Sequence, residues 1–140
     1  MAHNCKSLVI HCMDFRLIDS IREWMQKEGM LCDADVVSLA GATKEILDGT
    51  EGAKDLVLKQ IQLSAELHLA TQVVIVHHSD CGAYRASYNF STTEEEKEIQ
   101  LRDMEKVKGI IKEKFPQMEV VKVWAQLKDA EGKEVEFEKI

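Results

Sequence analysis

The chain has 140 residues, of which 45% are apolar and 31% are charged, a balance typical of one globular domain with its own core. Its 18 basic and 25 acidic residues give a formal charge of −7, which argues against a nucleic-acid partner or an anionic membrane surface. No run approaches the roughly 18 apolar residues that a membrane-spanning helix needs. We therefore expect a single domain over residues 1–140 that contacts neither nucleic acid nor membrane.

The N-terminal residues lack the apolar stretch of a secretory signal, and the cysteines are too few and too scattered for a disulfide framework. These features predict a cytoplasmic protein whose thiols are free or bound to metal. Neither Cys5 nor Cys32 has a ligand-type neighbour at metal-binding spacing, so we interpret both as ordinary apolar residues.

In the first half of the chain, residues 6–11 surround the apolar run Leu8-Val9-Ile10 and are predicted to form a short buried strand. Residues 18–28 carry apolar side chains three and four positions apart, which predicts a helix ended by Gly29. This apolar stripe consists of Ile18, Ile21, Trp24 and Met25. A second strand is predicted over residues 35–39. The dense apolar repeat over residues 50–69 predicts a long helix that is buried on more than one side.

In the second half, residues 72–77 are predicted to form a third strand. The Ser-Thr-Thr-Glu-Glu-Glu run at 91–96 offers capping boxes for a helix that runs to about Phe115 and is stopped by Pro116. The seam of this helix consists of Leu101, Met104, Val107, Ile111 and Phe115. A fourth strand is predicted over 120–127, and the alternating pattern of 133–138 is typical of a half-exposed edge strand.

This order of elements predicts a three-layer α/β/α domain, with a mostly parallel sheet of four strands plus a C-terminal edge strand. Binding sites in such sheets lie beyond the carboxyl ends of the strands, where the winding direction reverses. Cys12 follows the first strand, and His78 and Cys81 follow the third. If these two strands are neighbours, the three side chains converge.

Two thiolates and one imidazole suit Zn²⁺, and three protein ligands leave the fourth position open, as in catalytic zinc sites. Zinc lowers the pKa of bound water towards 7 and so supplies a nucleophile. We prefer His78 to His77 as the ligand, because alternation along a strand would point His77 elsewhere. The other histidines are interpreted as structural or solvated: His3, His11 and His68.

Asp14 and Arg16 add a second function to the predicted site. While the chain stays extended, Cys12, Asp14 and Arg16 lie on one side of it. Asp14 can accept a hydrogen bond from a zinc-bound water, or can itself fill the fourth position on the metal. The guanidinium of Arg16 can bind both carboxylate oxygens and hold Asp14 off the metal, which would make the pair a gate.

The pattern Cys12-x-Asp14-x-Arg16, followed later by His78-x-x-Cys81-Gly82, resembles the β-class carbonic anhydrases. The likeness covers roughly residues 6–135 and includes the strand and turn at 36–41 and the ending that begins at Val123.

The resemblance implies a Zn²⁺ cofactor held by Cys12, His78 and Cys81, with Asp14 and Arg16 as the gating pair. The implied reaction is the reversible hydration of carbon dioxide to bicarbonate by zinc-bound hydroxide. It also implies a homodimer or higher homo-oligomer, with active sites at the subunit interface.

The sequence also departs from that family. It begins almost at the first strand, without the N-terminal helical arm and the glutamine that this region commonly contributes. Ser38-Leu39 stands where Arg-Asn is usual, and Ala42 replaces a common Asn. Two alternatives therefore stay open. One is a catalytically weak zinc-binding or regulatory protein; the other is a hydrolase of carbon disulfide or carbonyl sulfide.

Overall fold

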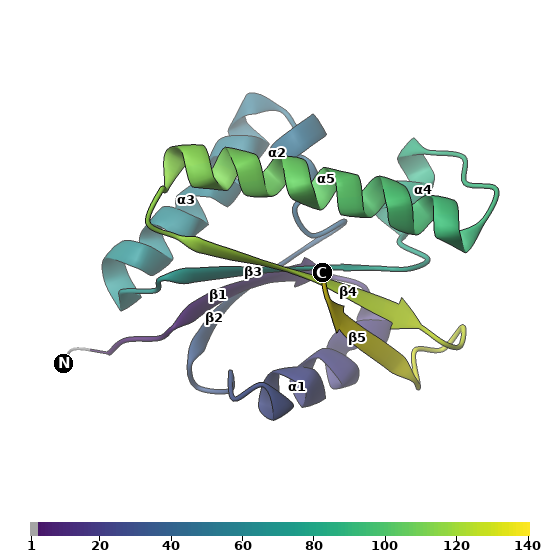
Figure 1. Cartoon of the computed structure of the whole chain (residues 1–140), viewed down its shortest axis with the longest axis horizontal. Helices are drawn as coiled ribbons and strands as arrows, with labels where there is room; N and C mark the ends of the chain where they lie inside the picture. Colours follow the sequence, from purple (N-terminus) through teal and green to yellow (C-terminus); the bar gives the residue numbers. More distant parts are fainter. Residues whose placement is uncertain (1–2) are drawn as a thin grey trace.

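A computed structural model describes residues 3–140 (Figure 1). Five strands form one sheet in the order β2-β1-β3-β4-β5, in which the first four are parallel and β5 runs antiparallel to β4. The strands are β1 (Ser7–Cys12), β2 (Ala34–Leu39), β3 (Gln72–His78), β4 (Glu119–Leu127) and β5 (Val135–Lys139). The predicted four-plus-one sheet is confirmed.

Helices cover both faces of the sheet, with α1 on one side and α2 to α5 on the other (Figure 1). The helices are η1 (Phe15–Leu17, a 3-10 turn), α1 (Ile18–Lys27), α2 (Lys44–Asp48), α3 (Glu51–His68), α4 (Gly82–Ser87) and α5 (Thr93–Lys114). This arrangement confirms the three-layer architecture. Within residues 3–140, no helix is long and apolar enough to cross a membrane.

Alternation along the strands builds two apolar cores. Leu8 and Ile10 of β1 pack in the core shared with α2, α3 and α5, whereas Val9 packs in the core shared with α1. β3 is buried on both faces, as expected for a central parallel strand. The two cores fix β1 and β3 side by side in the middle of the molecule.

Two expectations about helix burial were wrong. Helix α3 buries one face only, and Leu56 on its other side is 58% exposed, because the helix lies in an outer layer of the fold. Ile18 was placed on the buried stripe of α1 but is 65% exposed, since the helix begins there and its packed face starts at Ile21. The short helices α2 and α4 were not predicted.

Strand β1 lies between β2 and β3, and the winding direction therefore reverses at this strand. Register pairs His11 with Ser38 on one side and with Val76 on the other. The carboxyl ends of β1 and β3 consequently lie next to each other, at the position where ligands bind in open α/β sheets.

Candidate metal centre

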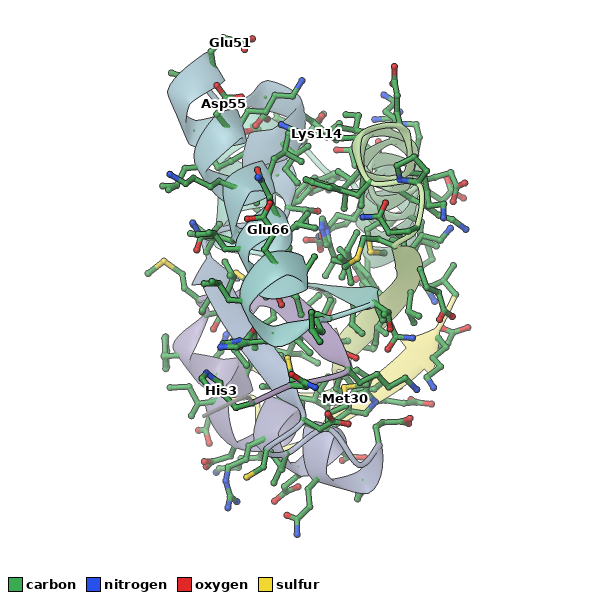
Figure 2. The ribbon with its side chains drawn as sticks, turned by 90° about the vertical axis from the view of Figure 1, so that its left-hand side faces the viewer. His3, Met30, Glu51, Asp55, Glu66 and Lys114 are labelled. Carbon is green, nitrogen blue, oxygen red and sulfur yellow. The ribbon has the colours of Figure 1, made fainter. Side chains whose placement is uncertain are left out.

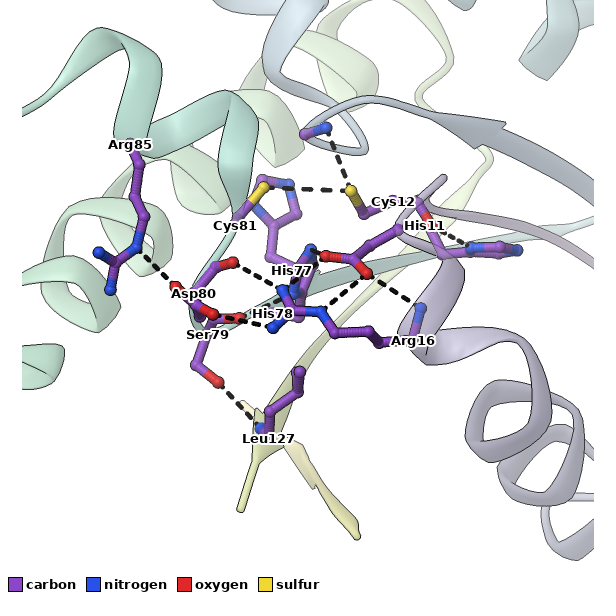
Figure 3. Close-up of polar contacts among 12 residues, drawn as sticks. His11, Cys12, Arg16, His77, His78, Ser79, Asp80, Cys81, Arg85 and Leu127 are labelled. Atoms are coloured by element: carbon purple, nitrogen blue, oxygen red, sulfur yellow. Dashed lines mark hydrogen bonds and ion pairs between the residues drawn. The ribbon is translucent and has the colours of Figure 1, made fainter. Parts of the chain in front are cut away.

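Three side chains with metal-ligating atoms meet at the carboxyl ends of β1 and β3 (Figure 3). Cys12 is the last residue of β1, His78 is the last residue of β3, and Cys81 lies in the turn that leads into α4. The two sulfur atoms are 4.0 Å apart, and the ligating atoms of all three residues lie within 4.8 Å of one another. All three side chains are buried.

A hydrogen bond to the backbone of the next residue orients the imidazole of His78. Its Nδ1 lies 2.7 Å from the carbonyl oxygen of Ser79, and because a carbonyl can only accept, Nδ1 carries the proton. Nε2 is then left with a free lone pair. Among the described residues, this atom is the one buried side-chain nitrogen or oxygen without a hydrogen-bond partner. A buried acceptor of this kind, close to two thiols, fits a bound cation.

The two thiols differ in their acidity. The hydrogen bond from Cys81 lowers the pKa of Cys12, with help from His78 and from the Gly41 N–H, which lies 3.4 Å from the Cys12 sulfur. The same contact with Cys12, together with burial, raises the pKa of Cys81. One thiol of the pair therefore ionises readily and the other resists. A divalent cation would remove that resistance, because it stabilises both thiolates.

His77 points away from the thiols. Its Nε2 lies 2.8 Å from the hydroxyl of Thr43, and its Nδ1 lies 3.0 Å from the side-chain oxygen of Gln100. Burial lowers the pKa of His77 to about 4, so the ring is neutral at pH 7. With both ring nitrogens bonded, His77 serves as a structural residue, and His78 is the imidazole beside the sulfur atoms.

Asp14 and Arg16 form a bidentate pair, although the chain between them is not extended as expected. The chain turns into η1 at Phe15, and Asp14 caps this turn by accepting the Arg16 N–H at 3.0 Å. The guanidinium donates to both carboxylate oxygens, at 3.0 and 2.7 Å. These hydrogen bonds hold the pKa of Asp14 below its usual value. Asp14 Oδ2 lies 4.0 Å from His78 Nε2.

An open cleft of about 640 Å³ leads to this group of residues. Its wall combines the charged groups of Arg16, Asp80 and Arg85 with apolar side chains. The apolar part of the wall is formed by Met13, Phe15, Ala40, Ala83 and Ala130. Cys12, although buried, is among the residues that line the cleft, so the cleft ends at the sulfur side of the cluster.

Residues 2–136 match the protein family described as "Putative carbonic anhydrase". The chain belongs to this carbonic anhydrase family. An uncharacterized protein of Rickettsia bellii is 37% identical over 123 residues, which are 84% of this chain and 74% of that protein. Another uncharacterized protein, from Rickettsia conorii, is 34% identical over 122 residues, which are 84% of this chain and 66% of that protein.

Solved β-carbonic anhydrases share the fold of the chain. The enzyme CafA of Aspergillus fumigatus superposes with a TM-score of 0.54 at 12% identity, over 99% of this chain and 76% of that one. One of two tetrameric β-carbonic anhydrases from Sordaria macrospora gives a TM-score of 0.54 at 16% identity, over 99% of this chain and 82% of that one. The predicted family and fold class are therefore confirmed.

Sequence reasoning missed the charged neighbours of Arg16 in this carbonic anhydrase family member. Arg16 Nη1 donates to Asp80 Oδ2 at 2.8 Å, and Nη2 donates to the Asp80 carbonyl oxygen at 3.0 Å. Arg85 Nε lies 2.7 Å from the other oxygen of Asp80 (Figure 3). Asp80 adopts a left-handed conformation with φ 56°, which orients it towards Arg16. Its position between His78 and Cys81 is the signal that could have revealed it.

A buried carboxylate on α5 holds the turn that carries Cys81, and this residue was also missed. Glu96 accepts the N–H of Asp80 at 2.9 Å and that of Cys81 at 3.0 Å. Gln100, one helical turn later, donates to the carbonyl oxygen of His78 at 2.9 Å and to Glu96 at 3.1 Å. The sequence placed Glu96 among capping residues, whereas the helix is capped by Thr92, whose hydroxyl oxygen accepts the N–H of Glu95 at 3.1 Å.

Proposed function

We propose that the chain is a zinc enzyme that hydrates carbon dioxide reversibly to bicarbonate. The observation that carries this proposal is the buried, partnerless Nε2 of His78 beside the sulfur atoms of Cys12 and Cys81. Membership of a carbonic anhydrase family supports it. When bound, zinc would lower the pKa of a coordinated water towards 7 and make it a nucleophile at neutral pH.

The protein residues have separate roles in this proposal. Cys12, His78 and Cys81 would hold the ion and leave its fourth position open to the cleft. Asp14 would accept the proton of the nucleophile in a hydrogen bond. Arg16, which binds both carboxylate oxygens, would hold Asp14 in that role and off the metal.

A hydration assay tests this proposal. The zinc-loaded protein should raise the rate of carbon dioxide hydration above that of buffer between about pH 7 and 9, where a zinc-bound water is ionised. The Cys32→Ser variant, which changes an exposed thiol, should retain the rate. If the protein contains zinc and hydration is no faster than in buffer, the proposal is wrong. Carbon disulfide and carbonyl sulfide, assayed in parallel, identify a hydrolase of those substrates.

A second candidate function is a zinc-binding protein with little catalysis, and the position of Asp14 favours it. Asp14 Oδ2 lies 4.0 Å from His78 Nε2, so a small movement would bring the carboxylate to the open position of a metal held there. The ion would then have four protein ligands and no site for water.

Replacing Asp14 with alanine separates the two candidates. For the enzyme, Asp14→Ala should keep its zinc, change the pH profile of hydration and lower kcat/KM by about 10²-fold, because the nucleophile loses its proton acceptor. Zinc content and hydration rate are measured on the same sample. Asp55→Ala, at an exposed carboxylate of α3, is the matched control. Loss of zinc in Asp14→Ala would make Asp14 a ligand and favour the second candidate.

We further propose that the chain forms a homodimer or a higher homo-oligomer. Met13 and Phe15 at the cleft are 64% and 81% exposed, and Ile18 beside them is 65% exposed. Apolar side chains gathered at one place on a surface are typical of an interface. Sedimentation velocity should show a dimer or larger species that shifts towards monomer in Phe15→Ser. Leu67→Ser, at an exposed leucine of α3, is the control, and a monomeric parent protein would contradict the proposal.

A further inference from the structure

A second group of metal-ligating side chains lies at the opposite edge of the sheet, where the strands begin. Cys5 precedes β1, Asp35 is the second residue of β2, and His68 is the last residue of α3. Their ligating atoms all lie within 4.8 Å of one another. The length of β1, at about 3.3 Å per residue, separates this edge from Cys12 by about 20 Å. The group is therefore distinct from the candidate metal centre.

Asp35 is the centre of this group. His68 Nδ1 lies 2.8 Å from both of its carboxylate oxygens, and Ser64 donates to Oδ2 at 2.6 Å. The backbone N–H of Cys5 donates to the carbonyl oxygen of His68 at 3.0 Å, which brings the thiol to the same place. The thiol of Cys5 donates to the Ser7 carbonyl oxygen at 3.4 Å, an ordinary length for a sulfur donor, and its sulfur still lies within 4.8 Å of the ligating atoms of the His68–Asp35 ion pair.

A fourth candidate ligand lies beside the group. The ring centroid of His3 is 4.9 Å from that of His68, with the ring planes inclined at 51°. Figure 2 looks onto this end of the molecule, with His3 near the start of the described chain. His3 is exposed, whereas the side chains of Cys5, Asp35 and His68 are half-buried. The position is thus open to an ion from solvent.

We propose that Cys5, Asp35 and His68, with His3 as fourth ligand, form a second binding site for a divalent transition-metal ion such as zinc. The thiol and imidazole disfavour Ca²⁺ and Mg²⁺, which prefer oxygen ligands, and suit zinc or cobalt. The incoming ion would displace the thiol proton of Cys5 and the proton between His68 and Asp35. It would join the start of β1 to β2 and to the end of α3.

This proposal differs from the interpretation, based on spacing in the sequence, of Cys5 as an ordinary apolar residue and of His3 and His68 as structural or solvated. Spacing along the chain shows no partner for Cys5, because Asp35 and His68 reach it only through the pairing of β1 with β2 and the return of α3. Cys32, by contrast, is exposed and belongs to neither group.

Zinc counting on the full chain tests the site. Metal-stripped protein is equilibrated with zinc by dialysis, and the bound zinc per chain is measured by mass spectrometry. Cys5→Ser should bind one ion fewer than the parent protein, and His68→Gln should lose the same ion. Cys32→Ser is the matched control and should bind as many ions as the parent. If either Cys5→Ser or His68→Gln binds the full complement, the proposed site is wrong.

The count also separates this site from the candidate metal centre. The difference in bound zinc per chain between the parent and Cys5→Ser tests the proposed second site, whatever the total number of bound ions. The corresponding difference between the parent and Cys81→Ser tests the candidate metal centre. Hydration by Cys5→Ser should equal that of the parent, since Cys5 lies at the other edge of the sheet. Cobalt titration gives a further readout, because a thiolate-to-cobalt charge-transfer band should weaken in Cys5→Ser and be unchanged in Cys32→Ser.

Discussion

Replacing Cys81 with serine should remove zinc from the candidate metal centre and, with it, the stability that the metal supplies. Serine has nearly the size of cysteine but is a poor zinc ligand, so the metal-free fold should change little while the affinity collapses. At a free zinc concentration 100-fold above the dissociation constant, a bound ion stabilises the folded chain by about 3 kcal/mol. Denaturant unfolding with and without a chelator measures this difference.

The comparison is best made in a Cys5→Ser background, where the group at the other edge of the sheet no longer contributes. There the parent should lose about 3 kcal/mol of unfolding free energy on addition of chelator, and Cys81→Ser should show no response. Cys32→Ser in the same background should respond like the parent. If Cys81→Ser binds zinc as well as the parent does, Cys81 is not a ligand.

Replacing Glu96 with alanine should lower the unfolding free energy by about 3 kcal/mol. The substitution leaves the backbone N–H groups of Asp80 and Cys81 without their acceptor, and each such loss costs about 1–3 kcal/mol before water partly replaces it. It also removes one of the two acceptors of the Gln100 amide, which keeps its hydrogen bond to the carbonyl oxygen of His78. The turn that carries Cys81 should loosen as well. Zinc affinity should therefore fall on the order of 10- to 100-fold, as for other residues that orient ligands.

Two matched variants define the role of Glu96. Glu94→Ala removes an exposed carboxylate from the first turn of the same helix and should cost less than about 1 kcal/mol. Glu96→Gln keeps the shape and one acceptor oxygen but turns a donor towards a backbone N–H, so its effect should be intermediate. If Glu96→Ala is as stable as Glu94→Ala and binds zinc as tightly as the parent, the buried carboxylate does not position the turn.

The architecture was predictable because local patterns agree with the fold. All five strands and the three longest helices follow from apolar periodicity and caps, and Pro116 ends the last helix as expected. Burial was less predictable. The apolar repeat of α3 does not reveal that Leu56 faces solvent, because that depends on which side of the helix the sheet covers.

Site residues that directly follow a strand were predictable from the sequence. Site residues that reach the site from a distant segment were not. Cys12, His78 and Cys81 lie at the ends of two strands that the fold places side by side, and their role as zinc ligands stays a prediction. Glu96 was hidden, because an acidic residue early in a helix is usually explained by the helix dipole. Its burial becomes visible only when α5 is placed over the end of β3.

The central position of β1 has a consequence for the order of assembly. Both neighbours of this strand, β2 and β3, follow it in the chain, so a nascent polypeptide presents Cys12 well before its partner thiol is synthesised. Pairing of β1 with β3 joins segments far apart in sequence, which makes it a slow step of folding. The candidate metal centre is therefore incomplete until β3 and the turn after it have been made, and an ion that needs all three side chains could bind only then.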